Sequence, residues 1–133
     1  MPFAFPVRVY WEDTDAGGIV FYANYLKFFE RARTEWLRSL GVHQSELRER
    51  TGGMFVVAET SVRYLQPARL DDELSVTAQL EETGRATFTI SQQALLQPAG
   101  TLLAEGTIRI GWVDAATLRP ARIPAMILEQ LKR

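Results

Sequence analysis

The chain has 133 residues and a mass of 15.1 kDa, a length typical of one folded domain, here expected to span residues 1–133. It contains no cysteine, which excludes a disulfide framework, a thiolate metal site and a cysteine nucleophile. The formal net charge of −1 argues against nucleic acid as a partner, and the lack of a long apolar run or a signal peptide predicts a cytoplasmic protein without a transmembrane segment.

The first predicted element is a strand over residues 6–11. Alternation along this stretch puts Val7, Val9 and Trp11 on one face, the pattern of a half-buried strand. The pattern stops at a polar loop over residues 12–18, which we consider below as the candidate site.

Residues 22–40 follow with apolar side chains at helical spacing, which predicts one long helix. Gly41 is expected to end this helix in the left-handed conformation. A short helix is expected over residues 45–50 with Ser45 as its N-cap. The single histidine, His43, lies between the two helices and is interpreted as stabilising the end of the first through the helix dipole. The apolar stripe of the long helix consists of Tyr22, Tyr25, Leu26, Phe29, Ala32, Trp36, Leu37 and Leu40.

From Met54 onward the hydrophobic period changes to two, which predicts four strands. Turn residues at 82–84 and 98–100 predict two hairpins and favour an antiparallel meander. Residues 124–133, with a proline at the start, predict a terminal helix. The residues expected to share faces are Val56, Ala58, Thr60, Val62 and Tyr64; Leu74, Val76, Ala78 and Leu80; Ala86, Phe88 and Ile90; and Leu102, Ala104, Ile108, Ile110 and Trp112.

This order of elements predicts an α+β fold. The broad aromatic stripe of the long helix must be covered, and a five-stranded antiparallel sheet wrapped around that one central helix is the available cover. Residues 54–58 are apolar on both faces, which predicts a subunit contact and an obligate homodimer. Trp11, Trp36 and Trp112 lie on apolar faces and are expected in the core.

The loop between strand and helix carries the carboxylates Glu12, Asp13 and Asp15. Acidic residues at a helix entry are stabilised by the dipole, but Asp15 lies seven residues before Tyr22, the first residue of the apolar stripe. That separation is too long for a standard N-cap unless the loop folds back.

The loop has two further interpretations. In an EF-hand, Asp13 and Asp15 would take the first and third ligand positions, but Gly17 and Asn24 stand at the fifth and twelfth, so the calcium pattern fails. Alternatively, the loop folds back and Asp15 faces the free N–H groups at the helix start. A carboxylate opposite N–H donors suits attack on an acyl carbonyl.

Three segments carry a family resemblance: residues 10–25 (YWEDTDAGGIVFYANY), 28–33 (FFERAR) and 62–72 (VRYLQPARLDD). They closely resemble the signature of hotdog-fold acyl-CoA thioesterases, in particular the Tol-Pal-associated YbgC-type branch of the 4-hydroxybenzoyl-CoA thioesterase family. The resemblance covers nearly the whole chain. It implies the hotdog fold, no cofactor, an acyl-CoA substrate and homo-oligomers, either dimers or a homotetramer, with an acyl-carrier protein as an alternative carrier.

The resemblance also assigns the site residues. Asp15 would be the catalytic residue, as nucleophile or general base, and the backbone N–H of Tyr22 would polarise the thioester carbonyl. Many members of the branch carry histidine at the position of Tyr22, so a histidine-dependent step is not available here. No metal is implied. Positioning roles fall to Asp13, Gly18, Asn24 and Tyr25, with plain packing as the alternative for Asn24 and Tyr25, and CoA binding falls to Arg85 in a hairpin turn.

The sequence therefore predicts hydrolysis of acyl-CoA thioesters to free acid and CoA. A hotdog dehydratase is a weaker alternative, because such enzymes use a histidine and His43 lies outside the motif. A non-catalytic module that binds acyl thioesters or an acyl-carrier protein in an envelope complex is the alternative from another class.

Overall fold

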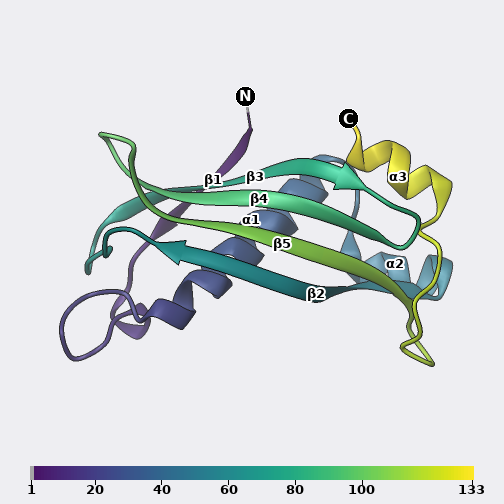
Figure 1. Cartoon of the computed structure of the whole chain (residues 1–133), viewed down its shortest axis with the longest axis horizontal. Coiled ribbons are helices and arrows are strands. Elements are labelled where there is room, and N and C mark those ends of the chain that lie inside the picture. Colours follow the sequence, from purple (N-terminus) through teal and green to yellow (C-terminus); the bar gives the residue numbers. More distant parts are fainter. Residues whose placement is uncertain (1) are drawn as a thin grey trace.

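Five antiparallel strands form one sheet, and a long helix lies across one face of it, in the computed structural model of residues 2–133 (Figure 1). The order of strands is β1-β3-β4-β5-β2. This arrangement confirms the predicted α+β fold with a five-stranded sheet packed on a central helix. The strands are β1 (Phe3–Arg8), β2 (Gly53–Tyr64), β3 (Glu73–Thr83), β4 (Thr87–Leu96) and β5 (Thr101–Asp114).

The predicted hairpins joining β3 to β4 and β4 to β5 are confirmed, but the meander is wrong for β2. This strand pairs with β5, with Tyr64 opposite Ala104, and forms the edge of the sheet far from β3. The reason lies in residues 65–72, which are too long for a tight turn and carry Asp71 at a left-handed φ of 71°. They lead the chain past the helix start before β3 begins.

The long helix begins with a 3₁₀ turn, η2 (Tyr22–Asn24), and continues as α1 (Tyr25–Ser39), close to the predicted bounds. α1 packs over β3, β1 and β4. Tyr22 and Leu26 are exposed, so their place in the apolar stripe was wrong: Tyr22 precedes α1, and Leu26 points away from the sheet. The buried residues of α1 are Tyr25, Phe28, Phe29, Ala32, Trp36 and Leu37.

Two short helices, α2 (Gln44–Thr51) and α3 (Ala125–Leu131), lie at the opposite end of the molecule from the 12–18 loop (Figure 1). Gly41 has a φ of 85° and ends α1 as predicted. His43, not Ser45, is the N-cap of α2, because the N–H groups of Glu46 and Leu47 already donate to the His43 carbonyl. His43 therefore lies at the start of α2, and its interaction with the dipole at the end of α1 stays a prediction. None of the helices within residues 2–133 has the length and apolar content needed to span a membrane.

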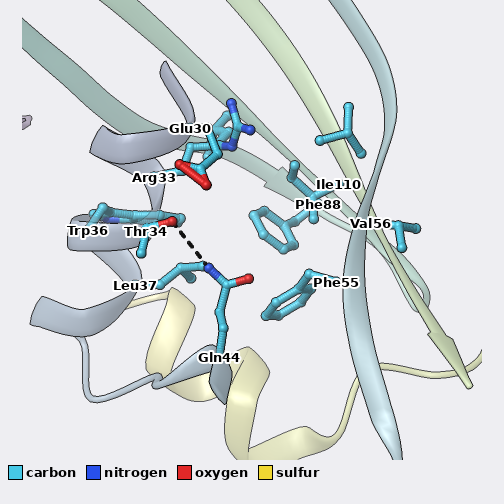
Figure 2. Close-up of a pocket in the computed structure, with 12 residues that line it drawn as sticks. Glu30, Arg33, Thr34, Trp36, Leu37, Gln44, Phe55, Val56, Phe88 and Ile110 are labelled. Carbon is cyan, nitrogen blue, oxygen red and sulfur yellow. Dashed lines mark hydrogen bonds between the residues drawn. The ribbon is translucent and has the colours of Figure 1, made fainter. Parts of the chain in front are cut away.

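The core consists of two clusters. One lies mainly between α1 and the sheet, and the other also includes residues of α2 and α3. Trp36 and Trp112 are buried as predicted. Gly53 opens β2 against Trp112, and a Cβ at this position would lie 2.3 Å from the indole, so only glycine allows this approach. Beside the second cluster, Phe55 and Phe88 pack edge to face at 5.3 Å and border a cavity (Figure 2).

Trp11 is the exception among the tryptophans, because its side chain is 79% exposed. β1 ends at Arg8, three residues before the predicted end, and residues Trp11–Asp13 form a 3₁₀ turn, η1. The turn arises because the Tyr10 N–H donates to the Asp13 carboxylate at 2.8 Å. The strand alternation is therefore lost before Trp11, and the prediction of a core position was wrong.

Candidate active site

The segment between η1 and η2 folds back on itself. Thr14 pairs with Val20 in an isolated bridge, and the Phe21 N–H donates to the Asp13 carbonyl at 3.0 Å. The far side of the loop is held by residues 65–72, the crossover segment between β2 and β3, because the Val20 N–H donates to the Ala68 carbonyl at 2.9 Å. The loop is therefore an ordered element built on the end of β1 and on residues 65–72.

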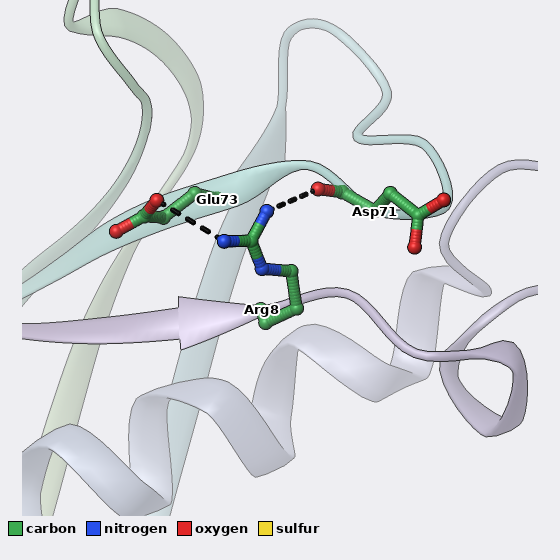
Figure 3. A network of polar contacts seen from close by, with 3 residues as sticks. All are labelled: Arg8, Asp71 and Glu73. Carbon is green, nitrogen blue, oxygen red and sulfur yellow. Dashed lines mark hydrogen bonds and ion pairs between the residues drawn. The ribbon is translucent and has the colours of Figure 1, made fainter.

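The base of this loop is fixed by an arginine at the end of β1 (Figure 3). The guanidinium of Arg8 donates to the Asp71 carbonyl at 2.8 Å and contacts the Glu73 carboxylate at 3.4 Å. The backbone adds contacts between the same segments, because the Val9 N–H donates to the Asp72 carbonyl and the Val9 carbonyl accepts the Asp71 N–H. The exposed ion pair contributes little by itself, but the contacts fix where the chain leaves the sheet.

Asp15 lies at the tip of the loop, with its side chain exposed. Its Oδ1 accepts the Gly17 N–H at 2.8 Å, and its backbone bonds to Ile19 and Gly18. Gly18 has a φ of 78°, a conformation that favours glycine. Within residues 2–133 no group donates to Oδ2, so one carboxylate oxygen is open to solvent and to any bound molecule.

Asp13 has a different environment from Asp15, since only 3% of it is exposed. Its two carboxylate oxygens accept hydrogen bonds from the Tyr10 N–H at 2.8 Å and from Asn24 Nδ2 at 2.7 Å. Asn24 is itself buried in η2. Asp13 therefore joins the end of β1, the loop and the helix start through one carboxylate, and it has no free oxygen for a ligand.

Tyr22 opens η2, and the hydrogen bonds of residues 2–133 include no acceptor for its backbone N–H. The first closed bond of the turn runs from the Asn24 N–H to the Phe21 carbonyl. Free N–H groups at a helix start carry partial positive charge and bind anionic oxygen. The side chain of Tyr22 is 63% exposed and meets the ring of Tyr64 at 6.0 Å.

Tyr25 anchors the helix start to the crossover segment. Its hydroxyl oxygen accepts the Ala68 N–H at 3.1 Å, and its ring packs against Tyr64 at 5.6 Å. Burial raises the pKa of Tyr25, and this effect outweighs the hydrogen bond from Ala68, which lowers the pKa. Tyr25 is thus a neutral, buried brace between α1 and residues 65–72.

Tyr25→Phe is expected to lower the free energy of unfolding by about 1–3 kcal/mol, because the buried Ala68 N–H loses its acceptor. The raised pKa adds a pH dependence. Because the pKa of Tyr25 is higher in the folded protein, the unfolded chain releases the Tyr25 proton at a lower pH. The free energy of unfolding of the wild type therefore falls as pH rises from about 10 through the folded pKa, whereas Tyr25→Phe lacks this fall. Urea unfolding at pH 7 measures the loss of stability, and urea unfolding above pH 10 measures its pH dependence. Tyr10→Phe, at an exposed position, is the control. Equal alkaline slopes for wild type and Tyr25→Phe would contradict the assignment.

An apolar cavity of about 280 Å³ lies beside the helix start. The periodicity of the sequence did not indicate this cavity, although Tyr64–Pro67, which line it, fall within the 62–72 segment that carries the resemblance. The period-two pattern grouped Tyr64 with the other residues of one strand face, but it does not show that the Tyr64 ring, at the end of β2, meets Tyr22. The cavity is lined by Ile19, Val20, Tyr22, Tyr25, Tyr64, Leu65, Gln66 and Pro67.

Arg85 is exposed in the β3–β4 hairpin, where its carbonyl accepts the Ile123 N–H at 2.8 Å. The loop with Asp15 adjoins the other end of β3, through Asp72. An eleven-residue strand spans roughly 35 Å at about 3.3 Å per residue. The structure therefore does not bring Arg85 to Asp15 within one copy of the chain.

Comparison with known proteins gives consistent matches over most of the chain. The sequence profile of the thioesterase-like superfamily matches residues 9–131. The chain is 43% identical over 122 residues to an acyl-CoA thioesterase YbgC of Haemophilus influenzae, which covers 92% of this chain and 88% of that protein. It is 41% identical over 132 residues to an acyl-CoA thioester hydrolase YbgC of Escherichia coli, with 98% and 96% covered.

Among solved structures, a hypothetical protein from Aquifex aeolicus is 35% identical to this chain and superposes with a TM-score of 0.88, covering 98% of this chain and 99% of that one. The strand order and the helix packing are those expected from the resemblance, so the predicted hotdog fold is confirmed.

Proposed function

Since the chain belongs to the thioesterase-like superfamily, we propose that it hydrolyses acyl-CoA thioesters to a free acid and coenzyme A, with Asp15 as the catalytic carboxylate. The observation that carries this proposal is the pairing of two features on one folded-back segment. Within residues 2–133, an exposed carboxylate with one oxygen that accepts no hydrogen bond lies at the tip. A backbone N–H without an acceptor among these residues lies where the segment becomes a helix, beside an apolar cavity.

The chemistry follows from the charge that develops during thioester cleavage. The Tyr22 N–H donates to the thioester oxygen, which becomes negative as the carbonyl carbon is attacked, and the loss of one such donor typically costs about 10²–10³ in rate. Asp15 either attacks the carbon, giving an anhydride and the CoA thiolate, or removes a proton from an attacking water. The acyl group lies in the apolar cavity next to Tyr22 and Tyr64.

The remaining residues of the site act through position. Gly18 allows the turn that presents Asp15, and Asp13 and Asn24 hold the loop against the helix start. Tyr25 keeps residues 65–72, which wall the cavity, against α1. Each of these residues is a positioning residue in the proposal, because its polar groups bond to the protein.

We also propose that the chain acts as a homo-oligomer. Arg85 lies too far from Asp15 to bind CoA at the site of its own chain, so it can serve only the site of another copy. β2 supports this assembly. It is a twelve-residue edge strand without proline, whereas the other edge, β1, is shorter and carries Pro6, a residue that blocks edge pairing. Val57 on β2 is 53% exposed.

Antiparallel pairing of β2 with the β2 of a second copy is therefore expected, and the protein should elute at twice 15.1 kDa or at a higher multiple at micromolar concentration. Val57→Lys should weaken this dimer by roughly tenfold or more, because charge on an edge strand opposes pairing. Ala4→Lys on the exposed edge β1 is the matched control. Light scattering after gel filtration gives the mass, and a 15.1 kDa wild-type monomer would refute the assembly.

Thioester hydrolysis is tested with a panel of acyl-CoAs and a thiol reagent. Release of free CoA above background supports the enzyme, whereas tight binding without release supports a non-catalytic module. Enoyl-CoA formed from hydroxyacyl-CoA would instead support a dehydratase. An acyl-carrier protein as the carrier, a tetramer and a cytoplasmic location stay predictions.

A further inference from the structure

An open groove of about 380 Å³ lies on the surface where η1 meets the last residues of the crossover segment. It borders the ends of β1 and β3, whereas β2 is the opposite edge of the sheet. Pairing of two copies through β2 therefore leaves this side of the sheet uncovered. The groove is lined by Tyr10, Trp11, Glu12, Leu70 and Asp71.

Two aromatic rings of the groove remain in contact with water, although they lie on an ordered turn. Trp11 is 79% exposed and Tyr10 is 62% exposed. The backbone beneath them is fixed, because the Trp11 carbonyl accepts the Thr14 N–H at 3.2 Å and the Thr14 hydroxyl at 3.0 Å. Tryptophan and tyrosine are enriched at binding interfaces and among the residues that contribute most to affinity. Two exposed rings on a fixed turn therefore indicate a docking surface.

The charged groups that line the groove are both carboxylates. Glu12 and Asp71 are exposed, and neither belongs to an ion pair of 4.0 Å or less within residues 2–133. Arg8 donates to the Asp71 carbonyl and not to its side chain, and Figure 3 shows the Asp71 carboxylate pointing away from the guanidinium. The groove thus combines two aromatic faces with two negative charges that have no cation bound to them among the described residues.

We propose that this groove binds a basic segment of a partner protein, with an arginine or lysine side chain on the Trp11 ring and its charge next to Glu12 and Asp71. Cations are attracted to the face of an aromatic ring, most strongly to that of tryptophan. A guanidinium can also form paired hydrogen bonds with a carboxylate. The same charges disfavour other partners, because they repel an anionic membrane surface and the phosphates of nucleic acid.

Peptide binding at this groove does not depend on the proposed hydrolysis, because no side chain that lines the groove contacts the substrate in that proposal. The two can therefore fail separately. Glu12→Gln should weaken binding of a basic peptide and keep kcat. Asp15→Asn should lower kcat and bind the peptide like the wild type.

The direct test is a titration of the full-length protein into a short, fluorescently labelled peptide in which arginine alternates with glycine. The reference is the same peptide with citrulline in place of arginine, which keeps the shape of the side chain and removes its charge. Fluorescence anisotropy gives both affinities. The wild type should bind the arginine peptide at least about fivefold more tightly than the citrulline peptide, because only arginine offers a cation to the ring and the carboxylates.

Variants of the groove separate the two contributions. Trp11→Leu should lower the affinity for the arginine peptide, whereas Trp11→Phe should keep most of it, since leucine is apolar but has no aromatic face. The double variant Glu12→Gln/Asp71→Asn should bind both peptides equally, and asparagine tolerates the left-handed φ of 71° at Asp71. Glu46→Gln/Glu49→Gln, at exposed positions of α2, is the matched control and should keep the preference for arginine.

The exposure of Trp11 in the assembled protein can be measured independently. Trp36 and Trp112 are buried, so quenching by acrylamide should be much stronger in the wild type than in Trp11→Phe. Equal quenching would show that another copy of the chain covers the groove, and it would overturn the proposal.

Three further results would also overturn the proposal. The first is a wild type that binds the arginine and citrulline peptides equally or binds neither, a comparison that needs no variant to fold. The second is an unchanged affinity for the arginine peptide in Trp11→Leu. The third is binding to vesicles of phosphatidylcholine and phosphatidylglycerol that depends on Trp11, because it would assign the groove to a membrane surface.

Discussion

Asp15→Asn is expected to lower kcat for acyl-CoA hydrolysis by about 10²–10⁴, the usual contribution of a positioned acid or base, and to leave the free energy of unfolding unchanged. Asparagine keeps an oxygen that can accept the Gly17 N–H, the contact made by Asp15 at 2.8 Å, so the loop should retain its turn. The amide can neither take a proton nor attack a carbonyl. CoA release measured with a thiol reagent gives kcat, and urea unfolding gives the stability.

Glu12→Gln is the matched control, because Glu12 is an exposed carboxylate on the same segment and should be replaceable without loss of kcat. An Asp15→Asn enzyme with most of its activity would remove Asp15 from the mechanism. A single turnover in ¹⁸O-water then separates two routes. Label in the Asp15 carboxylate indicates hydrolysis of an anhydride, and its absence supports activation of water.

The elements of this fold could be predicted because they depend on local periodicity. The helix at residues 22–40 and the strands after Met54 were found within a few residues, and the left-handed end at Gly41 was correct. Which strands pair with each other was harder to predict from the sequence. A period-two pattern shows which side chains share one face of a strand, but it does not show which strand lies alongside. The pairing of β2 with β5 depends on the path of residues 65–72, which a local pattern does not describe.

The candidate site was predictable to a similar degree. The residue types of the acidic loop indicated its chemistry, but they did not separate the buried Asp13 from the exposed Asp15. That difference arises from Asn24, whose amide reaches Asp13 across the loop. The core position predicted for Trp11 was wrong because of the other oxygen of Asp13. It accepts the Tyr10 N–H and turns the chain before the strand alternation can reach Trp11. Arg85 shows a further limit of prediction from sequence. A motif does not show how far Arg85 lies from Asp15, because that distance depends on the length of β3.

Asp13→Ala is expected to lower both the free energy of unfolding and kcat, which distinguishes Asp13 from Asp15. The substitution leaves the partly buried Tyr10 N–H and the buried Asn24 amide without their shared acceptor. Each unpaired buried group costs about 1–3 kcal/mol, so a loss of roughly 2–6 kcal/mol follows if water reaches neither group. Urea unfolding measures this loss, and Glu12→Ala in the same turn is the control.

The coupling of Asp13 to catalysis can be isolated with Asn24→Ala, because the two side chains form one hydrogen bond of 2.7 Å. If that bond orients the helix start, either single substitution already removes it. The fold-loss of kcat in the double variant Asp13→Ala/Asn24→Ala should then be much smaller than the product of the two single fold-losses. KM should change less than kcat, because the Tyr22 N–H contributes most when charge develops on the thioester oxygen. A kcat unaffected by Asp13→Ala at temperatures where the variant is folded would confine Asp13 to stability. The loop would then be positioned by its backbone bond to Ala68 and by the bridge between Ile19 and Arg69.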